Sequence, residues 1–195
     1  MKKFITIAVL GLALTGSVFA QGPFGFERGM TREQIIKLVG SDAVDKEHSN
    51  PELMIVKTAA LNPHFQMYGL FFSPTQGLLK IAASGNDIET GDAGFELRTE
   101  FKDLVEIITQ KYGQPTAKHT TMTSTGSEYW MLDLKQKNVT WSAYWLGNGY
   151  QNSITAISVS IEVVNIQKGY CMLDYEFEGW KAFVDSKTAK QNQSF

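Results

Sequence analysis

The longest helical pattern in the chain covers residues 95–112. Apolar residues from Leu97 to Tyr112 recur at intervals of three and four, the spacing of one face of an α-helix. Gly113 and Pro115 follow directly, and both residue types are common just past a helix end. The pattern predicts an amphipathic helix of about five turns with one face on a core.

A shorter helix is predicted to start after Thr31. Thr31 and Gln34 have the spacing of a capping box, in which each side chain satisfies a backbone N–H of the first turn. Ile35 and Val39 continue an apolar stripe, and Gly40 stands where a left-handed cap is favoured.

Strand-like segments occupy most of the remaining chain. Residues 41–52 are polar, contain Asn50-Pro51, and predict a long loop instead. Apolar runs bounded by Gly, Pro and Asn predict strands. The eight segments are 53–60, 65–73, 77–84, 117–123, 127–134, 139–146, 153–164 and 169–177. Strict alternation in 139–146 and 153–164 is typical of antiparallel strands that have one face on a core and one toward water.

The order of these elements predicts an α+β fold. Helix and strands occur twice, in 31–84 and in 95–164, and one such unit alone leaves a sheet face uncovered. We therefore expect one domain over 21–187, built on an antiparallel sheet of about eight strands with two main helices on one face. A short C-terminal helix at 179–187 is expected to lay Trp180, Phe183 and Val184 on the core, and 188–195 to be a flexible tail.

Part of the chain resembles a known fold family. Phe26 to Gly40 resembles the opening of exported proteins of the β-lactamase-inhibitor-like fold, a group that includes the small lipoprotein of the outer-membrane barrel-assembly machine. Gly77–Ile81, Phe101–Pro115 and Gly169–Phe177 are similar to uncharacterised bacterial periplasmic proteins of this build. The resemblance implies the same α+β plan. It does not imply inhibitory activity or lipidation, because the inhibitors' disulfides and the lipoproteins' N-terminal cysteine have no counterpart here.

The first 20 residues have the pattern of a signal peptide. Lys2 and Lys3 precede an apolar run from Phe4 to Leu14, and Val18-Phe19-Ala20 offers a cleavage site. The run is too short to span a bilayer, and no later stretch approaches the ~20 apolar residues needed. We expect a mature protein that starts at Gln21 and resides in a bacterial periplasm, with full secretion as the alternative.

Composition narrows the functional classes. The chain has 195 residues, 43% of them hydrophobic and 19% charged, which is ordinary for a folded domain. Its formal charge is −2, and loss of Lys2 and Lys3 leaves 16 basic against 20 acidic residues, a net charge of −4. Such a chain offers no basic field for nucleic acid, so a nucleic-acid partner is not expected.

Cys171 is the single cysteine, so no disulfide within the chain is possible. Strand alternation in 169–177 places Cys171 on the same face as Leu173 and Tyr175. Free cysteine is among the most buried residue types, which favours a place in the core over a nucleophile or an intermolecular disulfide.

Familiar catalytic and metal-binding motifs are missing from the sequence, and no cofactor or metal is expected. The acidic loop with Asp87, Glu89 and Asp92 fails the EF-hand pattern and predicts a solvated turn, with a calcium site as the alternative. The histidines, His48, His64 and His119, lack metal-ligand spacing.

Aromatic and methionine side chains gather on the strand face opposite the predicted core. Such residues are enriched at protein interfaces because they give large contact areas at low entropic cost. The predicted partner-binding residues are Tyr129, Met131, Tyr144, Tyr170 and Met172, interleaved with acidic and hydroxyl side chains. The leading hypothesis is a non-enzymatic module that binds an envelope protein through an open sheet face. The alternative is a cell-envelope hydrolase with its site in a loop, at Asp87–Asp92 or Pro63–His64.

Overall fold

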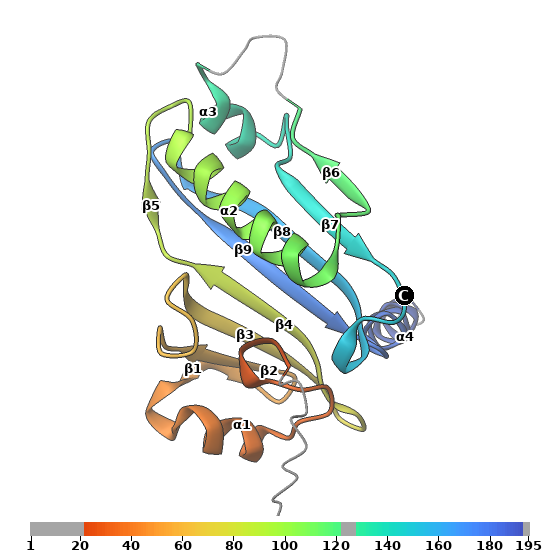
Figure 1. The fold of residues 1–195 in the computed structure, drawn as a ribbon. Helices are drawn as coiled ribbons and strands as arrows, with labels where there is room; N and C mark the ends of the chain where they lie inside the picture. The colour runs from red at the N-terminus through yellow and green to blue at the C-terminus, as the bar shows by residue number, and fades with distance from the viewer. Residues whose placement is uncertain (1–21, 122–127, 193–195) are drawn as a thin grey trace, which may run out of the picture.

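The computed structural model describes residues 22–121 and 128–192, and it has an α+β fold built on one antiparallel sheet (Figure 1). The α-helices are α1 (Arg32–Val39), α2 (Phe95–Tyr112), α3 (Trp130–Lys135) and α4 (Trp180–Asn192), with short 3-10 turns η1 (Pro23–Gly25), η2 (Ser41–Ala43) and η3 (Gln151–Ser153). The strands are β1 (Val44–Asn50), β2 (Leu53–Lys57), β3 (Phe65–Ser73), β4 (Gly77–Gly85), β5 (Ile88–Glu89), β6 (Ala117–His119), β7 (Ser142–Leu146), β8 (Ile154–Asn165) and β9 (Lys168–Phe177).

The sheet joins the two predicted helix-and-strand units through its last strand. The strand order is β1-β2-β3-β4-β9-β8-β7-β6, and β5 pairs with one end of β9. Strands of the first unit therefore form one half of the sheet and those of the second unit form the other. β9 pairs with β4 on one side and with β8 on the other, so the C-terminal strand lies inside the sheet and connects its two halves.

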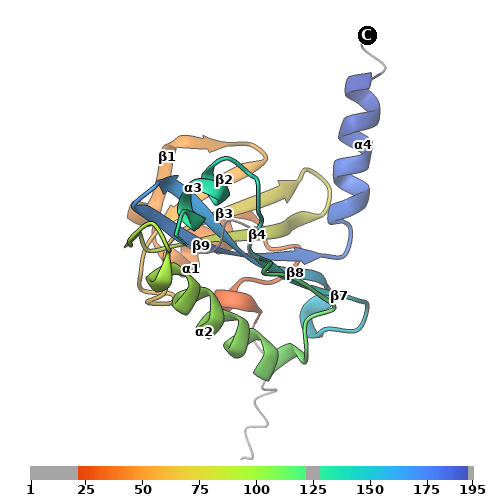
Figure 2. The same ribbon diagram turned by 90° about the horizontal axis from the view of Figure 1, so that it is seen from above.

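Both main helices pack on the same face of the sheet, which we call the inner face (Figures 1 and 2). Leu97, Phe101 and Leu104 of α2 are buried there, as predicted from their spacing, and Ile35 of α1 is fully buried. Thr31 and Gln34 form the predicted capping box at the start of α1. Alternate residues of the strands complete a continuous core on this face.

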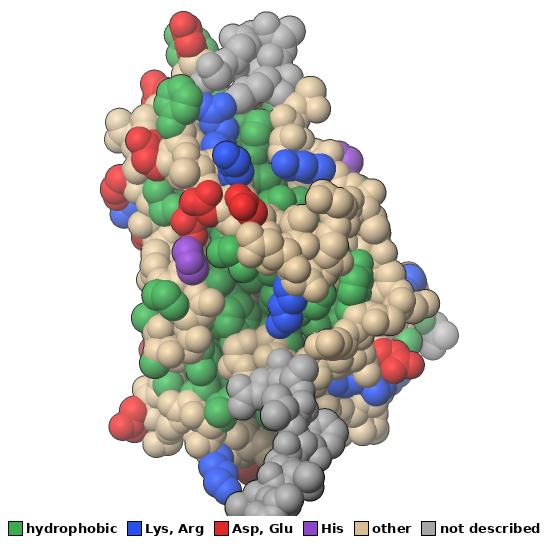
Figure 3. All heavy atoms as spheres, in the orientation of Figure 1, with side chains coloured by type: hydrophobic (Ala, Val, Ile, Leu, Met, Phe, Trp, Pro, Cys, Tyr) green, Lys and Arg blue, Asp and Glu red, His purple; other side chains and the backbone are tan. Residues whose placement is uncertain are grey.

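The segment just before α1 belongs to the core. Pro23 in η1 is buried, and the ring of Phe24 lies edge-on to the rings of Phe65, Tyr68 and Tyr175, at centroid distances of 5.4, 5.0 and 6.0 Å. Hydrophobic side chains gather on the helix-bearing side in this area between α1 and α2 (Figure 3). The chain from Gly22 onward is thus part of the folded domain.

The prediction of a strand at 127–134 is wrong for residues 128–134, and position 127 lies outside the described residues. Residues 130–135 form α3, whose buried side chains Trp130, Met131 and Leu134 follow helical spacing. Trp130 packs edge-on against Trp141 at 5.2 Å, and its ring lies over Gly94, where a Cβ atom would come within 2.1 Å. The apolar spacing of this short segment fits either structure, so periodicity alone does not distinguish a helix from a strand here.

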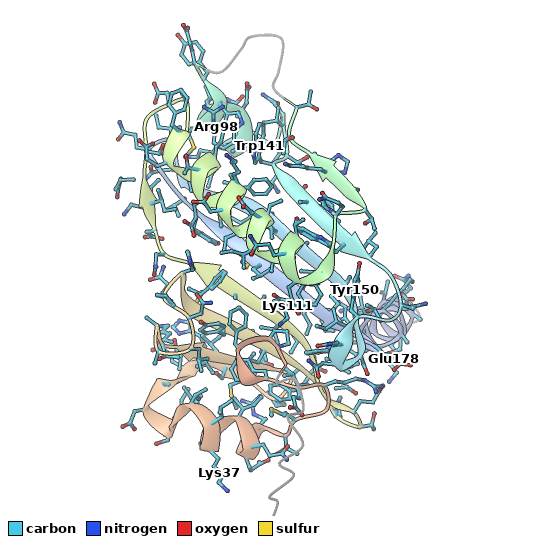
Figure 4. All side chains as sticks on the ribbon, viewed as in Figure 1. Lys37, Arg98, Lys111, Trp141, Tyr150 and Glu178 are labelled. Carbon is cyan, nitrogen blue, oxygen red and sulfur yellow. The ribbon has the colours of Figure 1, made fainter. Side chains whose placement is uncertain are left out.

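Helix α3 covers the end of the molecule where α2 begins, near Arg98 and Trp141 (Figure 4). The Arg98 guanidinium lies between two aromatic rings, 4.6 Å from the Phe95 centroid and 5.5 Å from that of Trp130. Within the predicted strand 117–123, the described strand β6 ends at His119, and positions 122–123 lie outside the described residues.

The loop predicted at 41–52 is also different, because most of it forms the edge strand β1. Its sequence is polar on both faces, since an edge strand of this kind has no buried face to enforce alternation. At the other end, α4 continues to Asn192, beyond the predicted limit at Lys187, and has no buried residue. It projects from the side of the sheet opposite α2 rather than packing on the core (Figure 2).

Candidate functional site

The candidate site is the outer face of the sheet, the side away from α1 and α2. Strand pairing aligns its side chains in rows across β7, β8 and β9. One row contains Tyr144, Ser158 and Asp174. The next contains Ser142, Ser160 and Met172, and it continues to Ser84 on β4.

Three of the five predicted partner-binding residues lie on this face. Tyr144, Tyr170 and Met172 are partly exposed, on β7 and β9. Ser84 Oγ lies 3.7 Å from Met172 Sδ and donates a weak hydrogen bond to it. Strand alternation in 139–146 and 169–177 was therefore sufficient to predict that these three residues share one surface.

Tyr129 and Met131 do not belong to that surface. Met131 is fully buried in α3, where it helps close the core. Tyr129 is 58% exposed, but it precedes α3 and is not part of the sheet. The predicted placement of both residues on a strand face is wrong for the same reason, because the chain forms a helix where a strand was expected.

The outer face is hollowed into a groove of about 520 Å³ at its β7–β8 end. Ser142, Ser158 and Ser160 provide short side chains in the middle of the groove. Tyr144 stands beside them as a longer side chain. A patch of short residues next to longer ones produces a depression without any opening in the sheet.

Charged side chains of both signs border the groove. Lys135 and Lys137 contribute from the end of α3 and the turn after it, and Glu162 and Asp174 contribute from β8 and β9. Glu162 accepts a hydrogen bond from Ser160 Oγ at 3.3 Å. Two basic and two acidic residues thus give the groove no net charge of either sign.

Among the described residues, no hydrogen-bond partner is present for two polar atoms at the groove. Ser142 is only 3% exposed, and its Oγ atom makes no hydrogen bond. Asp174 Oδ1 is likewise buried and unpaired, although Oδ2 of the same carboxylate receives Lys80 Nζ at 3.2 Å. Buried polar groups without partners are rare and destabilising, so these two atoms mark a position where a ligand could supply hydrogen bonds.

Lys80 is a residue of this face that the sequence analysis did not select. It pairs with Asp174 and lies 3.6 Å from Glu176 Oε1, and its ammonium group stands 5.7 Å from the ring centroid of Trp180 in α4. Lys80 stands between the buried residues Leu79 and Ile81, and this alternation indicates that its side chain points to the outer face. The pairing of β4 with β9 then brings Lys80 next to the acidic residues of β9.

The environment of Tyr170 is partly apolar and partly acidic. Burial raises the pKa of the Tyr170 hydroxyl, and the nearby carboxylates of Glu162 and Asp87 raise it further. Tyr170 is therefore protonated at neutral pH and can donate a hydrogen bond.

The loop predicted for the alternative hydrolase contains one histidine with a carboxylate partner. His64 Nδ1 lies 2.9 Å from Glu100 Oε1, beside a pocket of about 140 Å³ that Cys171 also lines. Cys171 is 1% exposed, and its Sγ is 3.9 Å from the carbonyl oxygen of Leu97. Burial raises the pKa of its thiol, and Glu100 raises it further, which is opposite to the activation that a nucleophilic thiolate requires.

The acidic loop forms local ion pairs. Lys168 Nζ lies 2.8 Å from Glu89 Oε1 and 3.8 Å from Asp87 Oδ2, and these carboxylates raise the pKa of Lys168. Over residues 22–121 and 128–192, no group of three or more His, Cys, Asp or Glu side chains is arranged to hold a metal ion.

The remaining histidines belong to separate local contacts. His48 Nδ1 lies 2.9 Å from Asp45 Oδ2. The His119 ring is edge-on to Tyr144 at a centroid distance of 5.9 Å, so this residue extends the outer face toward the β6 edge.

Comparison with known proteins gives no relative for this chain: no family model, no curated protein and no solved structure matches it. In the part of the chain that the structure describes, none of the helices has the length and apolar character that crossing a membrane requires.

Proposed function

We propose that this chain is a non-enzymatic periplasmic protein that binds a protein partner through the outer face of its sheet. The observation that carries the proposal is the partial exposure of Tyr144, Tyr170 and Met172 on the outer face of the sheet. Tyrosine and methionine are typical of interface centres, and acidic and hydroxyl groups around them fit a polar rim.

The chemistry of this face indicates what the partner must offer. Asp174, Glu176 and Glu162 supply hydrogen-bond acceptors, while Tyr144 and Tyr170 supply aromatic surface with a polar tip. A partner that matches them presents apolar side chains flanked by N–H or O–H donors.

Export to the periplasm is part of the proposal and rests on the sequence of residues 1–20. The buried position of Pro23 supports cleavage after Ala20 rather than further along the chain, because removal of η1 would expose part of the core.

The test is affinity capture from a periplasmic extract with the mature chain and two variants. The double variant Tyr144→Thr/Tyr170→Thr removes both rings and keeps β-branched residues in the strands. Truncation of an aromatic anchor typically costs about 2 kcal/mol, so capture should fall at least tenfold. Tyr129→Thr is the matched control, because it removes an exposed tyrosine outside the sheet and should capture as well as the unmodified chain.

Both variants must show an unchanged unfolding midpoint within a few degrees. A partner that is captured equally by the double variant would refute binding through the outer face. That result would favour the alternative function, a hydrolase at the His64–Glu100 pair, whose 2.9 Å contact is the observation in its support.

A further inference from the structure

Two buried side-chain atoms at the groove on the outer face have no hydrogen-bond partner among the described residues. The unpaired Ser142 Oγ is buried at one side, and the unpaired Asp174 Oδ1 is buried at another. A serine hydroxyl can donate or accept, whereas an ionised carboxylate oxygen only accepts. A ligand that satisfies both atoms must therefore bring at least one donor, and a second group of either kind.

Charge argues against an ionic ligand. Lys135 and Lys137 border the groove together with Glu162 and Asp174, so an anion would meet unfavourable carboxylates and a cation would meet unfavourable ammonium groups. The polar floor argues against a lipid chain, which would leave the hydroxyl groups without partners.

The position of the unpaired atoms argues against an extended peptide. Ser142 and Asp174 lie on β7 and β9, and each of these strands is paired on both sides. A peptide that adds to a sheet binds at an edge, where free main-chain groups are available. Here the available groups are side-chain atoms on the face of the sheet.

Besides the charged residues, the lining has five residues with hydroxyl groups and five apolar residues, which are Leu134, Val139, Trp141, Ile161 and Val163. Thr140, Ser142, Tyr144, Ser158 and Ser160 each place a hydroxyl-bearing side chain at the groove. A ligand with several hydroxyl groups matches them, because each ligand hydroxyl can either donate a hydrogen bond to a protein hydroxyl or accept one from it. The volume of about 520 Å³ is in the range of small-molecule sites.

We propose that this groove binds a saccharide of one or two rings. One sugar hydroxyl donates to Asp174 Oδ1, another on the opposite side of the ligand exchanges a hydrogen bond with Ser142 Oγ, and the C–H face of a ring packs beside Tyr144. The β-carbons of Ser142 and Asp174 lie on strands separated by β8 and are offset by two residues along the strand direction. Strand geometry places them about 12 Å apart, which leaves room for a ring between their side chains. This ligand goes beyond the proposed protein partner.

Titration of the isotope-labelled mature chain, followed by NMR chemical shifts, tests the proposal without any partner. The probes are maltose, a disaccharide with hydroxyl groups alone, and chitobiose, whose acetamido groups resemble those of a cell-wall glycan. We expect saturable shifts at residues of β7 and β8 with at least one probe. Tighter binding of maltose would indicate a sugar with hydroxyl groups alone as the natural ligand, and tighter binding of chitobiose would indicate a cell-wall sugar.

Two variants locate the binding and are matched by a control. Ser142→Ala removes an unpaired buried hydroxyl, so the fold should be as stable as before or more stable, while the dissociation constant should rise about fivefold to tenfold. Ser158→Tyr fills the groove and should abolish the shifts. Ser84→Ala makes the same small change on the same face outside the groove and should bind normally.

The absence of saturable shifts with both disaccharides overturns the proposal. So does binding that Ser142→Ala and Ser158→Tyr leave unchanged, or saturable binding of inorganic phosphate at these residues in place of the sugars. None of these results bears on capture of a protein partner by Tyr144 and Tyr170, so the two proposals fail separately.

Discussion

Asp45 shows how one side chain can stabilise an otherwise polar edge strand. Its Oδ2 atom lies 2.5 Å from Lys57 Nζ on the neighbouring strand, and its Oδ1 atom accepts backbone N–H groups of Glu47 and His48 at 3.1 Å each. These contacts satisfy backbone donors at the irregular part of β1 and connect the strand to β2.

The same contacts predict a pH dependence of stability. The Lys57 ammonium, followed by hydrogen bonds from His48, holds the pKa of Asp45 well below its usual value of 3.8. A lowered folded-state pKa stabilises the folded chain above pH 3.8, and this contribution is lost as the pH falls from there toward the folded-state value. In the Asp45→Asn variant, the free energy of unfolding should depend less on pH below 3.8. Urea unfolding between pH 2 and pH 7 measures this dependence.

Asp42→Asn is the control, because this carboxylate contacts only the neighbouring Ser41 Oγ among the described hydrogen bonds. Its profile should follow that of the unmodified chain. An Asp45→Asn profile that loses stability below pH 4 as steeply as the unmodified chain would show that Asp45 contributes nothing in this range.

Among the elements, α3 changes the predicted site most. Trp130, Met131 and Leu134 bury their side chains on one side of this helix, and Gly94 provides the space for the Trp130 ring. Gly94 has a φ of 65°, a backbone conformation that glycine adopts without strain. Close packing between α3 and the start of α2 thus depends on a residue about 36 positions earlier in the chain.

Two single variants test the helical assignment of α3. Met131→Ala should destabilise the fold by about 3 kcal/mol, because it empties a fully buried site. Tyr129→Ala should change stability by at most about 0.5 kcal/mol, because this side chain is mostly exposed. The free energy of unfolding in urea measures both. Equal effects would contradict the helix and restore the strand, in which both residues share a face.

Prediction from sequence succeeded where one face of an element is buried and periodic. Helix α2 and strands β7, β8 and β9 have such faces, so their alternation correctly located Tyr144, Tyr170 and Met172. It failed for β1, which has no buried face, and for α3, whose six residues fit either period. The groove could not be predicted, because it depends on the pairing of β7, β8 and β9.

At the scale of the whole molecule, the two halves of the sheet are joined by side chains as well as by β9. The His64–Glu100 contact ties the loop before β3, in the first half, to α2 in the second half. Helices α1 and α2 close the inner face across both halves, while α4 meets the outer face near Phe71 and Lys80. The β7–β8 end of the outer face remains accessible, since the groove opens there.

The most direct test of the central claim, that the outer face is the binding surface, is photo-crosslinking in living cells. A photoreactive amino acid replaces Tyr144 or Tyr170 on the outer face, Ile107 on the exposed side of α2, or Tyr129 before α3. The account predicts one discrete crosslinked species in the periplasmic fraction, formed from positions 144 and 170 and not from positions 107 and 129. Crosslinks formed from position 107 on α2 but from neither outer-face position would contradict it.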